Sequence, residues 1–388
     1  LCRSLDPLFR HAQWFALKHA GPERLDELER LCLQPETLPP FVMVQHVRLI
    51  YGALNNDLLL RLVWQVFLFY QAPFLSLPEN MAAFEECDGP LLEMIGLCRR
   101  KDWNGLWQSV VSYQEQLSRA FRRFYADHIT CEPVGKPIFF HWDAYEKSSQ
   151  RCYSLALDLL NDIYLGRYEP ELFLPSPSKI GEEKQVSVTT VRRTLTLLGH
   201  LGATRSINGV GTQALSPADS SQNCDLSQPV IQKRLLDFAQ SLQILALTCG
   251  ASLEITLDAM DAMAIQWWRN RLLALKENGR YESVVFDSLE VIPHFSPIRA
   301  VREIYRQLLR ILIWGYPLRS LHGSREQINA FYLPYINSLL EGLRQGDKKR
   351  LAAALEQMLL CEFRFAAIRL EELHVQGSAG LLVPEPFR

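Results

Sequence analysis

The stretch QVSVTTVRRTLTLLGHLGATRSINGVGTQAL, which runs from Gln185 to Leu215, decides the fold at the centre of this chain. Ser187 stands where a helix N-cap is expected, because its side chain can accept a hydrogen bond from the backbone of the first helical turn. The apolar residues Leu195, Leu197 and Leu198 follow at helical spacing. The sequence therefore predicts a helix over residues 188–201.

The second half of the same stretch has a different pattern. Gly202 can end the helix, because glycine adopts the left-handed conformation common just after a helix. The pair Asn208-Gly209 is the strongest short-range signal for a β-hairpin. We expect strands over residues 203–207 and 210–215 on either side of it.

Upstream, a helix is predicted over residues 147–165, with Gly166 after its last turn. A short polar helix over 177–184 and a turn at 185–186 then lead to the helix at 188. This order is a helix-turn-helix followed by a hairpin wing. In such a module the N-terminal residues of the last helix contact base edges, while the wing and the preceding turn contact phosphates.

These residues resemble the winged helix-turn-helix of GntR-type transcription regulators. The matching residues occur in the same order over about fifty positions: Gly166, Pro170, Leu174-Pro175-Ser176, Val186-Ser187, Thr190-Val191-Arg192, Leu195, Leu198, Gly202 and Gly209-Val210-Gly211-Thr212. The resemblance implies a DNA-binding head. It also implies the residues that contact DNA: Ser176, Lys179, Lys184, Ser187, Thr189, Thr190, Arg192, Arg193, Arg205, Asn208, Gly209 and Gly211.

The chain departs from the family pattern at positions that are expected to touch DNA. Ser178 and Val188 replace family arginines, and Val210 lies between the two wing glycines. An arginine that binds guanine contributes roughly 1 to 3 kcal/mol of discrimination, so their loss removes much of the sequence specificity. Two interpretations stay open. Either the head binds DNA through a divergent set of contacts, or it has become a structural module.

Composition describes an ordinary globular protein. The 388 residues are 48% hydrophobic and carry a net charge of −2, so any nucleic-acid surface must be local, and two or three domains are expected. Nine scattered cysteines without a CxxC pair fit a reducing cytoplasm better than a zinc or disulfide framework. The most apolar run, residues 58–77, contains Arg61 and Gln65 and is predicted to be a buried helix rather than a membrane span.

Outside the central region the apolar residues recur at helical spacing, so the chain is predicted to be mainly α-helical. A polar stretch, residues 216–223, is expected to be an exposed linker, and prolines and glycine make a second break at 131–136. The expected domains are a helical domain over 1–132, a winged helix over 140–215 and a helical domain over 224–388.

The two helical segments resemble each other at a shift of 244 to 245 residues. Residues 91–102 correspond to 336–347, and residues 67–73 correspond to 311–317. This correspondence predicts a tandem duplication, which would form a pseudo-dimer within one chain; a homodimer of single chains is the alternative. Because Leu1 falls within a predicted helix, a further winged helix is expected before it.

The helical segments look like the FCD-type effector domain of the FadR branch of the family, on the strength of residues 44–59 and Gly346-Asp347. The resemblance implies a metal site of one Asp and three His. Here only His46 occupies such a position. The other positions hold Val42, Leu91 and Gln114 in one segment and Glu290, Phe286, Ile336 and Leu359 in the other, so no metal and no other cofactor is expected.

A helical domain can still enclose a small organic effector among apolar side chains with a few polar anchors. The candidate ligand-binding residues are His46, Arg48, Tyr51, Tyr113, Arg302, Tyr305 and Trp314. No catalytic motif occurs, so an enzyme is not expected. The sequence thus predicts a transcription regulator that binds an operator in double-stranded DNA and senses a small organic ligand. The alternative is a sensor or scaffold that does not bind DNA.

Overall fold

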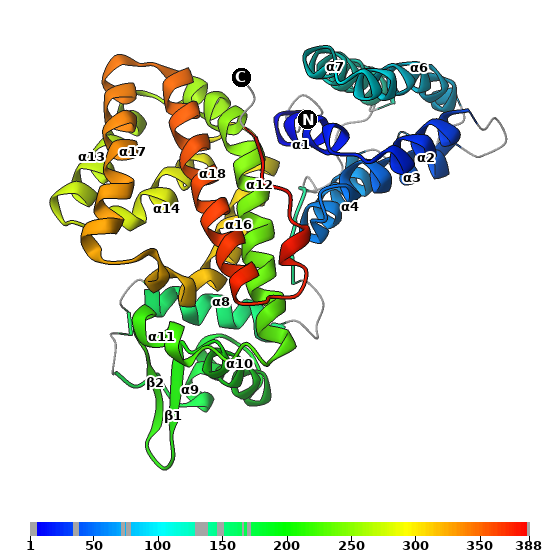
Figure 1. The fold of residues 1–388 in the computed structure, drawn as a ribbon. Helices are drawn as coiled ribbons and strands as arrows, with labels where there is room; N and C mark the ends of the chain where they lie inside the picture. Colours follow the sequence, from blue (N-terminus) through cyan, green and yellow to red (C-terminus); the bar gives the residue numbers. More distant parts are fainter. Residues whose placement is uncertain are drawn as a thin grey trace.

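The computed structural model describes residues 6–33, 39–70, 74, 79–128, 139–145, 151–164, 167–168 and 172–385 (Figure 1). It is mainly helical, and a single two-stranded sheet is present in these ranges. The predicted break at 131–136, the start of the predicted helix at 147, and Gly166 and Pro170 lie outside the described residues.

The N-terminal helices form what we call the first body. Figure 1 shows them, in blue and cyan, to one side of the rest of the chain. They are α1 (Asp6–Lys18), α2 (Pro22–Cys32), α3 (Pro39–Gly52), α4 (Asp57–Tyr70), α6 (Glu79–Arg100) and α7 (Trp103–His128). Residues 58–70 of the apolar run that was predicted to be a buried helix lie in α4, and Leu58, Leu62 and Val66 are buried in the core.

The central residues form what we call the head. It consists of α8 (Arg151–Tyr164), α9 (Pro177–Glu183), α10 (Val188–His200), β1 (Thr204–Ile207) and β2 (Gly211–Ala214). The strands are antiparallel, with Thr204 opposite Ala214 and Ile207 opposite Gly211. The predicted order of helix, turn, helix and hairpin is therefore confirmed, and α9, α10, β1 and β2 are each slightly shorter than expected.

The prediction of an exposed linker over residues 216–223 was wrong, because the structure has a short helix there, α11 (Pro217–Asn223). The Ser216 side chain caps it by accepting a hydrogen bond from Asp219 N, and Pro217 begins it. Ser220 is fully buried and its Oγ donates to the carbonyl of Leu201 at 3.1 Å. Polar residues thus form this helix because capping and tertiary contacts replace an apolar stripe.

The C-terminal residues form what we call the second body, built around the long helix α12 (Pro229–Ala259), which packs along α18 (Lys348–Glu372) (Figure 1). Around this pair lie α13 (Ala262–Glu277), η3 (Tyr281–Ser283), α14 (Val284–Leu289), α15 (Val291–Phe295), α16 (Arg299–Leu312), the 3₁₀ segment η4 (Ile313–His322) and α17 (Arg325–Gln345). A short 3₁₀ turn, η5 (Ser378–Gly380), follows α18.

Among the described helices α12 alone has the length and apolar composition of a membrane span, and 67% of its most apolar window is buried inside the protein. Its neighbours include α1, α4, α15, α16 and α18. The apolar side chains of α12 are therefore used in packing against other helices.

The turn between the last two helices is repeated in the two bodies. α6 ends at Arg100 and α7 begins at Trp103, while α17 ends at Gln345 and α18 begins at Lys348, 245 positions later in both cases. Lys101 and Gly346 both have positive φ, at 57° and 66°. The following residues, Asp102 and Asp347, both cap the next helix through their carboxylates. Local geometry and capping chemistry thus agree at equivalent positions.

The first body docks on α12 through buried polar contacts. The Asn56 side-chain amide donates to the carbonyl of Gln240 at 2.9 Å and to Oε1 of Gln243 at 2.8 Å. The C-terminal residues then cross to the first body, where Glu385 pairs with Lys18 at 2.5 Å. Because buried amides need partners, these bonds fix how the two bodies meet.

Candidate nucleic-acid interface and ligand cavity

The turn between α9 and α10 is set by two serine caps. Ser176 Oγ accepts from Lys179 N at 3.3 Å, and Ser187 Oγ accepts from Thr190 N at 3.1 Å. The buried Thr194 donates from Oγ1 to the carbonyl of Cys152 at 3.2 Å, which ties α10 to α8. These contacts fix α10 against α9 and α8.

One face of α10 remains exposed. Thr189, Arg192, Arg193 and Thr196 follow one another at intervals of three, one and three residues, and all are exposed. Thr196 was missed by sequence reasoning, although its spacing from Arg192 and Arg193 places it on the same face. Its Oγ1 donates to the Arg192 carbonyl at 3.0 Å. The exposed face thus combines two cations with short hydroxyl side chains.

The wing carries a further cation. Arg205 on β1 lies opposite Gln213 on β2, and its Nη2 donates to Gln213 Oε1 at 3.0 Å. Gly209 has φ 75°, which the turn requires and glycine adopts without strain. At the base of the wing, residues 172–174 pair with β2 through two backbone hydrogen bonds, from Leu174 N to the Thr212 carbonyl and from Ala214 N to the Leu172 carbonyl. The wing is therefore anchored on both edges of β2.

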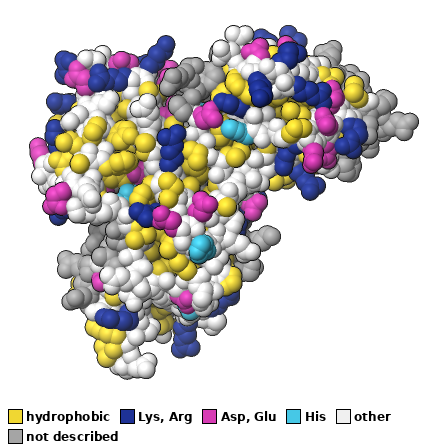
Figure 2. Space-filling view, in the orientation of Figure 1, with side chains coloured by type: hydrophobic (Ala, Val, Ile, Leu, Met, Phe, Trp, Pro, Cys, Tyr) yellow, Lys and Arg dark blue, Asp and Glu magenta, His cyan; other side chains and the backbone are white. Residues whose placement is uncertain are grey.

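The structure places every predicted DNA-contacting residue on the head, and all are exposed except Thr190, which is half-buried. Lys184 pairs with Asp162 at 3.5 Å. The side chains of Lys179, Arg192 and Arg193 have no hydrogen-bond or ion-pair partner within the part of the chain that the structure describes. Figure 2 shows basic side chains at the lower end of the molecule, where the head lies. Cations without intramolecular partners are suited to phosphates.

Apolar side chains also surround the wing. Val210 at its tip is 65% exposed, and Leu172 and Phe173 at its base are 52% and 45% exposed. These apolar side chains cannot form ion pairs or hydrogen bonds with phosphates. They are the apolar component of an otherwise polar and basic surface.

The predicted ligand-binding residues are scattered through both bodies. Tyr305 and Trp314 are fully buried; the Tyr305 and Thr248 hydroxyls lie 2.8 Å apart, and Trp314 Nε1 donates to the Tyr145 hydroxyl at 3.0 Å. Arg302 donates to the Ser296 carbonyl. The other candidates lie in the first body: His46, Arg48, Tyr51 and Tyr113. The structure does not bring the candidates together, and none of them lines the cavities described below.

His46 is half-buried, and its Nε2 lies 3.6 Å from Cys32 Sγ. Burial lowers the pKa of this imidazole from 6.5 to about 4. Among the described residues, no group of three or more His, Cys, Asp or Glu side chains could hold a metal ion. The contacts of His46 are those of a neutral side chain packed inside the first body.

A cavity of about 120 Å³ lies in the second body. We call it the second-body cavity. Its walls are mainly apolar side chains from α12, α14, η4, α17 and α18, such as Leu242, Val285, Leu318, Ile328 and Phe365. Sequence reasoning missed these residues, because they come from elements far apart in the chain.

Polar groups line one part of this cavity: Glu282, Arg319, His322, Tyr332 and Glu362. The Tyr332 hydroxyl donates to Glu362, and burial together with that carboxylate holds the pKa of Tyr332 well above its usual value. His322 Nε2 is buried 3.5 Å from Glu362 and has no hydrogen-bond partner among the described residues. A buried polar atom of this kind is available to a ligand.

Arg319 connects the second-body cavity to the head. Its guanidinium carbon lies 3.9 Å from the centre of the ring of Tyr164, the last residue of α8. Burial alone would raise the pKa of Tyr164, but the charge and hydrogen bond of Arg319 lower it below its usual value. A cation over an aromatic ring is attractive, by roughly 0.5 to 2 kcal/mol. Arg319 thus belongs both to the cavity wall and to a contact with the head.

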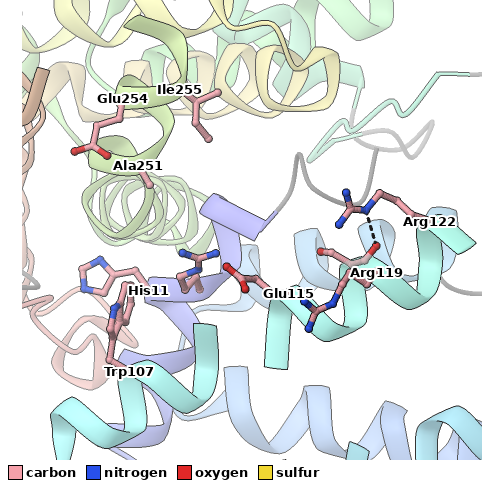
Figure 3. Close-up of a pocket in the computed structure, with 10 residues that line it drawn as sticks. His11, Trp107, Glu115, Arg119, Arg122, Ala251, Glu254 and Ile255 are labelled. Atoms are coloured by element: carbon pink, nitrogen blue, oxygen red, sulfur yellow. Dashed lines mark hydrogen bonds between the residues drawn. The ribbon is translucent and has the colours of Figure 1, made fainter. Parts of the chain in front are cut away.

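Two further clefts lie where separate groups of helices meet. One of about 510 Å³ separates α8 from the second body, and Arg310 crosses it to pair with Asp158 at 3.0 Å. The other, of about 590 Å³, lies between α1, α7 and α12 (Figure 3). There Figure 3 shows Glu115, Arg119 and Arg122 along α7, with Glu254 on α12 across the cleft. Acidic and basic side chains line both clefts, so neither cleft has charges of one sign only.

The sequence matches no family model, and no curated protein is similar to it. The fold is similar to a solved structure described as Streptococcus agalactiae GntR, with 16% identity over 55% of this chain and 99% of that chain and a TM-score of 0.24. It is also similar to a structure of Lar, described as controlling the Listeria monocytogenes agr system, with 17% identity over 56% and 97% of the two chains and a TM-score of 0.24. At these values the likeness does not establish a family.

Proposed function

We propose that this chain is a cytoplasmic transcription regulator that binds double-stranded DNA through its winged helix and senses a small organic ligand in its second body. The observation that carries the proposal is the exposed face of α10, where Thr189, Arg192 and Arg193 lie in the first two turns after the Ser187 cap. Short polar and cationic side chains at the start of a recognition helix are those that reach base edges and phosphates in the major groove.

The two bodies support a second part of the proposal, that the chain arose by duplication of an FCD-like helical domain. The turn that joins α6 to α7 recurs between α17 and α18 at a constant separation, with the same backbone conformation and the same aspartate cap. Two related bodies on one chain would take the place of the two subunits of a dimer. Dimers of winged-helix regulators bind two half-sites about one helical turn apart.

Ligand sensing is proposed to act through the contact between Arg319 and Tyr164. A ligand in the second-body cavity meets Arg319 on one side, while the Tyr164 ring of the head lies on the other. A ligand shifts an equilibrium only as far as it binds one state better than the other. Reorientation of Arg319 on ligand binding would change the stability of one arrangement of head and second body.

A gel mobility shift tests the proposal. The probe is DNA from upstream of the coding sequence, at low salt. We expect the wild-type chain to retard it and the double variant Arg192→Glu/Arg193→Glu to lose this retardation, because two positive charges become negative. Arg364→Glu is the matched control, since Arg364 is exposed on α18 in the second body. Equal retardation by all three proteins, or by none, would contradict DNA binding through α10.

A second candidate function is a sensor or scaffold that uses the head to bind protein. The observation in its favour is the apolar character of the wing, where Val210, Leu172 and Phe173 are all exposed. The substitution Val210→Lys separates the two candidates. A lysine at the wing tip should strengthen DNA binding if the wing lies on phosphates, and should have no effect on DNA if the wing binds protein.

A further inference from the structure

The two bodies differ at the positions that form the second-body cavity. The capped turns align Asp102 with Asp347, so residues of α7 correspond to residues 245 positions later on α18. Glu362 and Ala366 line the cavity, and their counterparts are Leu117 and Phe121. A carboxylate and a methyl group in one body are thus replaced by larger apolar side chains in the other.

Aromatic rings fill the corresponding place in the first body. Phe67, Phe74, Leu117, Phe121 and Phe124 form a separate buried cluster. The Phe74 ring centre lies 4.8 Å from that of Phe121 and 5.1 Å from that of Phe124, both in edge-to-face contact. Such packing leaves no room for a ligand without displacing rings, which close-packed interiors resist.

The groups that line the second-body cavity also indicate what it binds. Glu282, Glu362 and Arg319 all line the cavity, so charged side chains of both signs are already present without a charged ligand. Burying a further charge would be costly. His322 Nε2, which has no hydrogen-bond partner among the described residues, offers one hydrogen bond, and the remaining walls are mainly apolar. A cavity of about 150 Å³ in another protein holds benzene. The second-body cavity, at about 120 Å³, is therefore of a size for a ligand similar to benzene.

We infer that the ligand site of the chain lies in the second body, that the described part of the first body has no counterpart to it, and that it takes an uncharged molecule of about the size of benzene with one hydroxyl group that hydrogen-bonds to His322. This inference rests on the proposed ligand-sensing function. In the described part of the first body, aromatic side chains fill the equivalent space. Binding is therefore one per chain although two similar bodies are present.

Fluorine NMR with 4-fluorophenol as the probe, on the full chain, tests the inference. We expect saturation at one bound molecule per chain and weaker binding of fluorobenzene, by about tenfold, because it lacks the hydroxyl. Ala366→Phe places a ring where the first body has Phe121, and it should abolish binding. His322→Leu should remove the preference for 4-fluorophenol over fluorobenzene while both still bind. Phe121→Leu is the matched control in the first body and should bind as the wild type does.

Circular dichroism tests whether the Ala366→Phe protein is folded. If that variant does not fold, the His322→Leu variant still tests the inference. Two bound molecules per chain, undiminished binding to Ala366→Phe, or no binding at millimolar probe would overturn the inference. The DNA mobility shift is measured separately. Retarded DNA without probe binding refutes the cavity alone, whereas probe binding without retarded DNA refutes the regulator and leaves the cavity intact.

Discussion

Removing two arginines from α10 should change the salt dependence of DNA binding by a calculable amount. Lys184 pairs with Asp162 and is therefore not available for a phosphate. The side chains then available for phosphates on one head are Lys179, Arg192, Arg193 and Arg205. If each neutralises one phosphate, the logarithm of the binding constant falls with the logarithm of salt at a slope of about −3.6, since each contact contributes about 0.9. Raising salt fourfold then weakens binding about 150-fold.

The double variant Arg192→Ala/Arg193→Ala should have a slope of about −1.8, so the same rise in salt weakens its binding only about 12-fold. Fluorescence anisotropy of a labelled duplex of arbitrary sequence, between about 50 and 200 mM salt, measures both slopes. The operator need not be known, because phosphate contacts do not depend on sequence. Arg364→Ala, a change on α18 in the second body, should keep the wild-type slope.

Phosphate contact by Arg192 and Arg193 is refuted if the double variant and the wild type have the same slope. It is also refuted if the wild type fails to bind at the lowest salt concentration. In the first case the two arginines do not contact phosphate, and in the second the head does not bind DNA at all.

Three other predictions concern stability, each measured by urea unfolding. Gly202→Ala should destabilise the fold by roughly 3 kcal/mol, because φ is 77° and a Cβ would lie 2.4 Å from a backbone oxygen. Gly209→Ala, where φ is 75° and the surrounding space is open, should cost only about 1 kcal/mol. Equal losses of stability in the two variants would contradict the clash at Gly202. Burial lowers the pKa of His11 to about 4, so the unfolded chain takes up a proton first as pH falls below 6.5. Stability should fall towards pH 4.5, and His11→Gln should reduce this fall by about 2 kcal/mol; a variant with the wild-type pH profile would contradict it. Tyr316→Phe should cost about 1 kcal/mol because the Leu215 carbonyl loses its donor, and an unchanged midpoint would show that water replaces the hydroxyl.

The head was predictable because its signals are local. Ser187 caps α10 and Asn208-Gly209 turns the wing, and each signal lies within a few residues of the structure it determines. α11 was not predictable in this way. Its seven residues have no apolar stripe, and Ser220 is buried by contact with Leu201, which precedes it by nineteen positions. Sequence patterns report a helix face, but they do not report a partner that only the folded chain supplies.

The candidate ligand site shows the same limit. Tyr305 and Trp314 were selected as large polar aromatics on apolar faces, and both are enclosed in the core with hydroxyl partners. The cavity instead collects side chains from segments separated by more than a hundred residues, such as Leu242 and Phe365. Arg319 and His322 lie in η4, whose 3₁₀ geometry the helical pattern did not predict.

The docking of the first body on α12 through Asn56 has a consequence for how the protein responds to dilution. Two subunits that meet by diffusion separate when their concentration falls below the dissociation constant, whereas two bodies joined by one polypeptide keep a local concentration in the millimolar range. The spacing between them is therefore independent of copy number. A cell with only a few molecules would hold them in the same arrangement as a concentrated solution does.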